Sequence, residues 1–208
     1  MARRKTSVAG AEPPPGRVRI VAGKWRGRRL PVADVAGLRP TGERIRETLF
    51  NWLAPRIEGA RCLDLYAGTG ALGFEALSRG AGQVTFVERS PAAVAALRRA
   101  AALLGAEGAR IHAGDARELL RRGGQGGLDL VFLDPPFDGD RLSELCRLLA
   151  EGQWLAPAAA VYLEQARDAP EAALPEGWRT IREQRAGNVR FTLVLAAGGA
   201  GTSAEDPR

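Results

Sequence analysis

Four carboxylates stand at or just beyond the ends of apolar segments, and they are the first candidates for chemistry. They are Asp64, Glu88, Asp115 and Asp134. The segments alternate with helical patterns, which predicts a mainly parallel sheet covered on both faces. Because parallel strands end at one edge of such a sheet, and ligands bind there, the sequence predicts a single site that contains all four acids.

Asp134 is followed by two prolines and a phenylalanine: Pro135, Pro136 and Phe137. Proline has no N–H and a fixed φ, and it holds the preceding residue in extended geometry. The Asp134 carboxylate and the Pro135 carbonyl are therefore aimed at one point, as two acceptors for one NH₂ group, while Phe137 offers a face for stacking an unpaired base. A rigid exit from the strand is the simpler alternative for this motif.

An exocyclic base amine is a poor nucleophile because its lone pair is delocalised into the ring. Hydrogen bonds from both of its N–H groups orient the amine and favour a tetrahedral nitrogen, whose lone pair can attack a methyl group in line. Positioning and acceptor electrostatics account for such a reaction, and we expect no metal.

A glycine loop follows the first of these segments. Gly68, Gly70 and Gly73 fit a G-x-G-x-x-G frame between a strand and a helix. A dinucleotide would fit the glycines, but Asp64 would then repel its pyrophosphate. S-adenosylmethionine carries a sulfonium and an ammonium, so it suits an acidic site better, with Glu88 on the ribose and Asp115 near the adenine. The alternative for Asp64 is a carboxylate that only caps a turn.

Hydrophobic periodicity predicts an α/β fold. Strands are expected over 61–66, 83–88, 109–112, 128–133 and 159–164, helices over 70–79, 91–104, 115–122 and 141–150, and a closing antiparallel hairpin over 178–185 and 189–195 around Gly187-Asn188. Before them, residues 17–30 read as a hairpin, and Thr41 is expected to cap a helix with an apolar stripe at Ile45, Leu49, Trp52 and Leu53. Hairpin and helix, residues 17–58, form an N-terminal extension to a catalytic domain over 59–197, with disordered ends at 1–16 and 198–208.

The excess positive charge is confined to the N-terminal part of the chain. Residues 1–58 contain 13 Lys/Arg and 5 Asp/Glu, whereas residues 59–208 contain 17 and 19. Such an asymmetry is typical of a nucleic-acid contact. Cys62 and Cys146 show no ligand or disulfide spacing, and the chain has no secretion signal or long apolar span, so we expect a cytoplasmic protein that does not enter membranes.

The motifs together resemble the RsmD family of small-subunit rRNA guanine-N2 methyltransferases. The resemblance rests on "RIVAGKWRGRRLP", "LRPTGERIRETLFNWL", "CLDLYAGTGALGFEALSRGA" and "DPPF", and it covers roughly residues 17–195. It implies a Rossmann-like class I S-adenosylmethionine-dependent methyltransferase fold with a seven-stranded, mostly parallel sheet. It also implies N2 methylation of one guanine, position 966 of 16S rRNA, on an assembled or nearly assembled small subunit, by a protein we expect to be a monomer.

The resemblance assigns roles to individual residues. Asp134 to Phe137 become the catalytic loop, Asp64, Gly68 and Gly70 hold the methionine part of the cofactor, and Glu88 holds the ribose. The remaining predicted cofactor contacts flank these positions: Tyr66, Ala67, Thr69, Arg89, Asp115 and Ala116. Arg89 stands where the family often has an acidic or other polar residue. The predicted RNA contacts lie in the N-terminal extension: Arg17, Arg19, Lys24, Trp25, Arg26, Arg28, Arg29, Arg39, Thr41, Arg44 and Arg46. For Trp25, packing within the hairpin is the alternative.

Three other functions remain open from the residues alone. A DNA adenine or cytosine methyltransferase could use the same Asp-Pro-Pro-Phe loop, although the chain leaves little room for a target-recognition domain. A nicotinamide oxidoreductase would explain the glycines but neither Asp64 nor the double proline. A non-enzymatic RNA-binding protein would explain the charge, yet the proposed catalytic residues are all present. His112, the sole histidine, is expected to be structural.

Overall fold

The computed structural model describes residues 17–31, 41–136 and 141–197. The predictions for residues 1–16, for Arg39, for Phe137 and for residues 198–208 therefore lie outside the described residues. None of the described helices is long and apolar enough to cross a bilayer.

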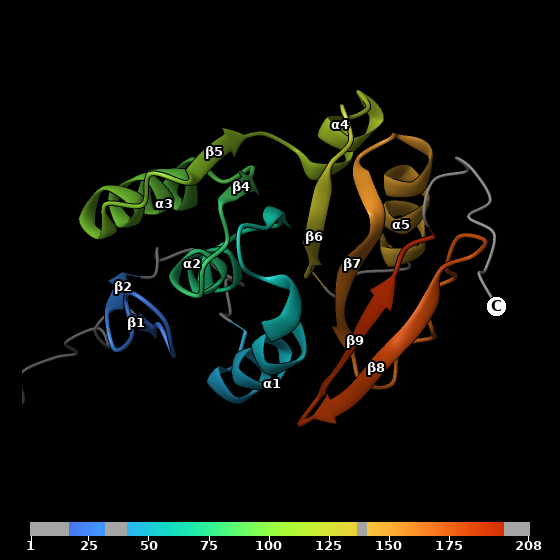
Figure 1. Cartoon of the computed structure of the whole chain (residues 1–208), viewed down its shortest axis with the longest axis horizontal. Coiled ribbons are helices and arrows are strands. Elements are labelled where there is room, and N and C mark those ends of the chain that lie inside the picture. The colour runs from blue at the N-terminus through green and yellow to red at the C-terminus, as the bar shows by residue number, and fades with distance from the viewer. Residues whose placement is uncertain (1–16, 32–40, 137–140, 198–208) are drawn as a thin grey trace, which may run out of the picture.

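Seven strands form one mixed sheet, in the order β5-β4-β3-β6-β7-β9-β8 (Figure 1). Strands β5, β4, β3, β6 and β7 run parallel, while β9 is antiparallel to both β7 and β8. The strands are β3 (Arg61–Leu65), β4 (Gln83–Glu88), β5 (Ala109–Ala113), β6 (Leu128–Leu133), β7 (Leu155–Ala166), β8 (Arg179–Ala186) and β9 (Val189–Leu195). The predicted seven-stranded sheet with its closing hairpin is confirmed.

Helices cover both faces of this sheet, because successive strand residues point to opposite sides. Cys62, Phe86, Phe132 and Tyr162 pack in one core beneath α1 (Glu43–Leu53), α2 (Ala71–Ser78) and α3 (Pro91–Leu104). Leu63, Val131 and Val161 belong to the second core, beneath α4 (Ala116–Arg121) and α5 (Arg141–Glu151). A short 3₁₀ helix, η1 (Ala54–Arg56), follows α1.

The N-terminal hairpin pairs β1 (Arg17–Arg19) with β2 (Arg29–Pro31) and lies beside α2 (Figure 1). The predicted stripe on α1 is buried at Ile45, Leu49 and Leu53, and Trp52 stacks on Phe191 of β9 with ring centroids 5.3 Å apart. The extension is thus packed on the catalytic sheet through the same hydrophobic core, rather than attached to it by a linker.

One predicted cap is wrong. Gly42 occupies the N-cap of α1 and makes no side-chain cap, and the Thr41 hydroxyl instead donates to Asp134 on the neighbouring sheet. Tertiary contact with a carboxylate replaced the local capping bond that Thr41 could have made.

Candidate active site

The carboxyl ends of β6 and β7 bring two acids side by side. Phe132 pairs with Tyr162, and Leu133 pairs with Leu163. Because alternate residues share a face, the following residues Asp134 and Glu164 are neighbours on the side of the sheet that α1 covers. We call these two residues the acid pair.

Asp134 is held by the N-terminal extension. The buried Thr41 hydroxyl donates to Asp134 Oδ2 at 3.3 Å. Burial, and then the charge of Glu164, raise the pKa of Asp134 well above its usual range, while the hydrogen bond from Thr41 acts in the opposite direction. Pro135 is buried and Pro136 is exposed, so the double proline leads the chain from the interior to the surface. Asp134 is therefore a partly buried acceptor whose affinity for a proton is increased.

Glu164 is a site residue that our sequence reasoning missed. Only 5% of it is exposed, and the buried Tyr162 hydroxyl donates to its Oε2 at 2.6 Å. Burial raises the pKa of Glu164, against the effect of this hydrogen bond. The signal was present in the sequence, since Glu164 ends the predicted strand over 159–164, as Glu88 ends the strand over 83–88.

The acids of the glycine-loop side are bound by backbone amides. Gly68 N–H donates to Glu88 Oε2 at 2.9 Å, and Ser90 N–H donates to Oε1 at 2.7 Å. Asp115 caps α4 and accepts from the amides of Arg117 and Glu118 at 2.9 and 3.2 Å. Glu88 is the last residue of β4, and Asp115 follows the end of the adjacent parallel strand β5. Both carboxylates fix the backbone around them through these hydrogen bonds.

The loop between β3 and α2 turns sharply. Tyr66 has a φ of 66° and Gly70 a φ of 76°, both in the left-handed region. Tyr66 is half-buried, and burial followed by the charge of Asp115 raises its pKa. Ala67, Thr69 and Ala116 are buried around this turn, whereas the Arg89 side chain is exposed to solvent. The predicted cofactor residues therefore gather at one edge, with Arg89 at its outside.

Asp64 does not lie where we predicted a contact with the methionine part of the cofactor. Its side chain is 2% exposed and accepts from the Gly73 amide at 3.0 Å, so it holds the start of α2 and does not face an open ligand site. Burial raises its pKa to about 7, more than the Gly73 hydrogen bond lowers it. The alternative in which Asp64 serves the turn is the one that the structure favours.

Arg46 is also not the phosphate contact we predicted. It is 3% exposed, and its Nη1 lies 3.3 Å from Oε2 of the fully buried Glu75. Its Nε donates to the Thr41 carbonyl at 3.1 Å. Because Glu75 also accepts from the amides of Val21 and Ala22, this ion pair joins the hairpin loop, α1 and α2. Arg46 therefore supports Thr41, and through Thr41 the position of Asp134.

Trp25 packs inside the protein rather than offering a stacking surface. It is 8% exposed, and its amide donates to Ser78 Oγ at 2.9 Å. The loop passes so close to α2 that a Cβ on Gly23 would lie 1.8 Å from the Ser78 carbonyl oxygen, and Gly23 has a φ of 79°. The packing alternative for Trp25 is the correct one, and Lys24 lies over its ring at 5.7 Å.

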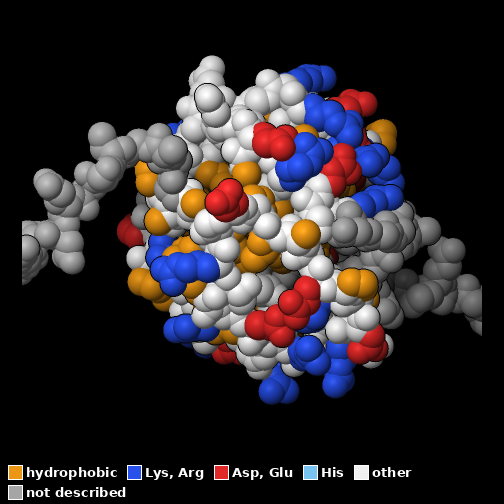
Figure 2. All heavy atoms as spheres, turned by 90° about the vertical axis from the view of Figure 1, so that its right-hand side faces the viewer, with side chains coloured by type: hydrophobic (Ala, Val, Ile, Leu, Met, Phe, Trp, Pro, Cys, Tyr) orange, Lys and Arg blue, Asp and Glu red, His pale blue; other side chains and the backbone are white. Residues whose placement is uncertain are grey.

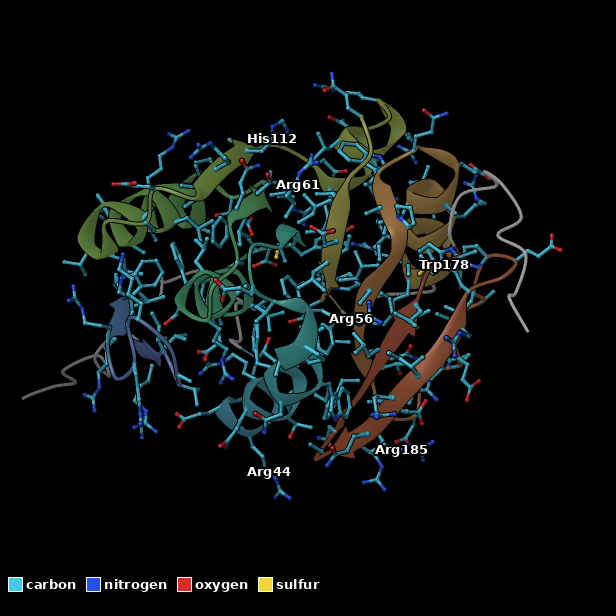
Figure 3. The ribbon with its side chains drawn as sticks, viewed as in Figure 1. Arg44, Arg56, Arg61, His112, Trp178 and Arg185 are labelled. Carbon is cyan, nitrogen blue, oxygen red and sulfur yellow. The ribbon has the colours of Figure 1, made fainter. Side chains whose placement is uncertain are left out.

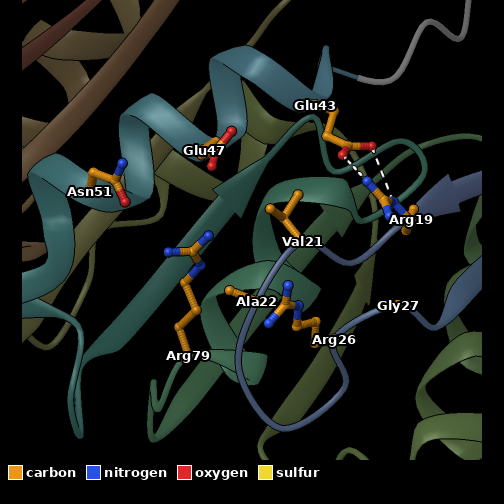
Figure 4. Close-up of a pocket in the computed structure, with 9 residues that line it drawn as sticks. All are labelled: Arg19, Val21, Ala22, Arg26, Gly27, Glu43, Glu47, Asn51 and Arg79. Atoms are coloured by element: carbon orange, nitrogen blue, oxygen red, sulfur yellow. Dashed lines mark hydrogen bonds and ion pairs between the residues drawn. The ribbon is translucent and has the colours of Figure 1, made fainter.

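Thr41, also predicted to contact RNA, is buried against Asp134, whereas the surface carries six of the predicted RNA contacts: Arg19, Lys24, Arg26, Arg28, Arg29 and Arg44. Arg19 and Arg26 line a pocket of about 460 Å³ between the hairpin loop, α1 and α2, where Arg19 forms an ion pair with Glu43 (Figure 4). Arg44 points outward from α1 (Figure 3), and Lys24, Arg28 and Arg29 are exposed. Arg17 lies on β1. The face opposite the hairpin instead mixes basic and acidic side chains (Figure 2). On β8, Arg182, Glu183 and Arg185 are exposed.

Comparisons with known proteins agree with this architecture. The family model described as Conserved hypothetical protein 95 matches residues 18–195. Ribosomal RNA small subunit methyltransferase D of Escherichia coli is 46% identical over 178 residues, covering 86% of this chain and 89% of the relative. The Haemophilus influenzae protein of the same name is 44% identical over 181 residues, covering 86% and 93%.

Solved structures show the same relationship. The putative methyltransferase yhhF from Escherichia coli superposes with a TM-score of 0.81 at 42% identity, covering 88% of this chain and 99% of that one. The family resemblance and the class I methyltransferase fold expected from the sequence are confirmed. The chain therefore belongs to the RsmD family of methyltransferases, whose curated members carry the name ribosomal RNA small subunit methyltransferase D.

Proposed function

We propose that this protein transfers a methyl group from S-adenosylmethionine to the N2 amine of one guanine in 16S rRNA, at position 966. The substrate we propose is the assembled or nearly assembled small ribosomal subunit. The observation that carries the proposal is Asp134, a partly buried acceptor followed by Pro135 and placed beside the glycine loop, in a chain whose curated relatives are named for this RNA.

The glycine-loop edge fits S-adenosylmethionine. Glu88 is partly exposed, and after its two backbone bonds it still has lone pairs for ribose hydroxyls. Among the described residues, no lysine or arginine forms an ion pair with Glu88 or Asp134, so neither carboxylate is already paired with a cation and both remain available to a cationic ligand. When bound, the cofactor supplies a methyl group on positively charged sulfur.

The protein's own residues would act on the amine. The Asp134 carboxylate and the Pro135 carbonyl accept its two N–H groups, which orients the nitrogen lone pair toward the methyl carbon. A nitrogen–carbon bond forms as the carbon–sulfur bond breaks with its electron pair on sulfur, and the nitrogen then gives up one proton. Because its pKa is raised, the Asp134 carboxylate is a suitable acceptor for that proton.

Labelled S-adenosylmethionine tests this function. We expect the protein to label small subunits that lack the modification, and to label naked 16S rRNA and duplex DNA weakly or not at all. Digestion of the labelled rRNA to nucleosides should yield N2-methylguanosine. Label that appears in DNA, or in a methylated adenine or cytosine, would instead support an amine methyltransferase with another target.

A further inference from the structure

Glu164 is a buried carboxylate for which the reaction described above has no use. It is 5% exposed, it directly follows the last residue of β7 that pairs with β6, and it is the neighbour of Asp134 on the same face of the sheet. Its described hydrogen bond comes from Tyr162, through Oε2. A second acid therefore lies beside Asp134, the residue that we assign to the target amine.

This arrangement does not favour stability. Adjacent carboxylates repel one another, and each loses hydration when it is buried. The part of the chain that the structure describes contributes no cation to either member of the acid pair. Tyr162 needs only one acceptor for its hydroxyl, and a neutral glutamine amide oxygen would satisfy it as well as a carboxylate does. Tyr162 alone therefore does not explain a carboxylate at position 164, whereas a ligand that donates hydrogen bonds would stabilise it.

The geometry also leaves an acceptor open to such a ligand. Every fully buried side-chain oxygen among the described residues has a partner, and no described residue donates to Glu164 Oε1. Oε1 therefore remains accessible beside Asp134. Because Glu164 is the neighbour of Asp134, an incoming base whose amine is held by Asp134 and Pro135 would bring a ring position next to that amine toward Glu164.

Only one of the amine-bearing bases has a donor there. In guanine the N2 amine lies between the N1–H donor and the N3 acceptor, whereas in adenine and in cytosine the one ring nitrogen beside the amine is a hydrogen-bond acceptor. A carboxylate at this place attracts the N1–H of guanine and repels the acceptor nitrogens of adenine and cytosine. We propose that Glu164 accepts the N1–H of the target guanine, and that this bond makes the enzyme specific for guanine. The proposal rests on the proposed N2 methylation of guanine.

The test replaces the target guanine of reconstituted small subunits by 2-aminopurine, which retains the 2-amine but has an acceptor at N1. Wild-type protein should methylate guanine about 10- to 100-fold better in kcat/KM, as expected for one charge-assisted hydrogen bond. Glu164→Gln should lose a similar factor on guanine, while its activity on 2-aminopurine should stay the same or rise, because the carboxylate no longer repels the N1 acceptor. The preference for guanine should then approach one. The proposal requires wild-type protein to prefer guanine, and because 2-aminopurine also lacks O6, the loss of that preference in Glu164→Gln is what assigns it to Glu164.

Tyr162→Phe is the matched control, because it removes the hydroxyl and keeps the charge of Glu164. We expect it to retain the preference for guanine. A Glu164→Gln protein that binds S-adenosylmethionine normally but keeps the full preference would overturn the proposal and assign Glu164 to Tyr162 alone. If the Glu164→Gln protein does not fold, wild-type protein still tests the proposal, because equal rates on guanine and 2-aminopurine would overturn it. Failure of the proposed function is distinguishable, since wild-type protein would then label no guanine.

Discussion

The two sides of the active-site edge handle their acids differently. On the glycine-loop side, Asp64, Glu88 and Asp115 all accept from backbone amides, at 2.7 to 3.2 Å. On the β6–β7 side, Asp134 and Glu164 accept from the hydroxyls of Thr41 and Tyr162.

The difference separates two tasks. An amide is fixed in the backbone, so a carboxylate bound to amides holds a loop in place for a cofactor. A hydroxyl supplies one rotatable donor and leaves most of the carboxylate's lone pairs open. We infer that the first side is built to keep its shape, and that the second is built to receive donors from a substrate.

The largest effect is expected from Asp134→Asn. The amide replaces an acceptor by a donor that faces the target amine, so single-turnover methyl transfer should fall about 100- to 1,000-fold or more. Calorimetry should show unchanged affinity for S-adenosylmethionine, because Asp134 is assigned to the target side. Activity within a few-fold of wild type would remove Asp134 from the reaction.

Glu88→Ala tests the opposite side of the comparison. The variant loses an acceptor for the Gly68 and Ser90 amides and a proposed ribose ligand, so cofactor binding should weaken by about 1.5–3 kcal/mol. Glu151→Ala is a matched control, since it removes an exposed carboxylate at the end of α5. Equal affinity of wild type and the Glu88 variant in calorimetry would mean that Glu88 only supports the loop.

A third variant tests the surface of the hairpin. It neutralises Arg26, Arg28 and Arg29 together. These exposed side chains should contact phosphates, and each lost contact should reduce the salt slope of subunit binding by about 0.7 to 0.9. A control with Arg121, Arg122 and Arg147 neutralised makes the same change of charge at the end of α4 and on α5, and should keep the wild-type slope. If the two triple variants show the same salt slope of subunit binding, the hairpin is not the docking surface.

The smallest effect on activity is expected from Asp64→Asn, because asparagine can still accept from Gly73. Stability should change with pH instead. The pKa of Asp64 is about 7 when folded, against 3.8 as its ordinary value. Between these values the folded state holds a proton that the unfolded state has lost, so wild-type unfolding free energy falls as pH rises, by up to about 1.4 kcal/mol per pH unit.

Urea unfolding at several pH values measures this slope. The Asp64→Asn protein should show a weaker fall between pH 4 and pH 7, and it should be the more stable of the two at pH 8. A slope that is the same in both proteins would show that Asp64 is ionised in the fold.

Much of this protein could be predicted from the sequence. The spans 83–88, 91–104, 128–133 and 189–195 are the observed bounds of β4, α3, β6 and β9, because hydrophobic period, glycine and proline act locally. The strand-end positions of Glu88, Asp115 and Asp134 followed from the same alternation. Glu164 ended the predicted strand as well, although the observed β7 continues to Ala166, and its role was missed because no turn motif follows it.

Only the tertiary structure decided which charged groups are buried. Arg46 and Glu75 are 29 residues apart, and Thr41 and Asp134 are 93 apart, so no local pattern relates them. Trp25 and Arg46 share the basic composition of their segment, yet packing against α2 removes both from solvent. Local periodicity determines the faces of an element, whereas burial and pairing depend on the neighbour that folding brings against each face.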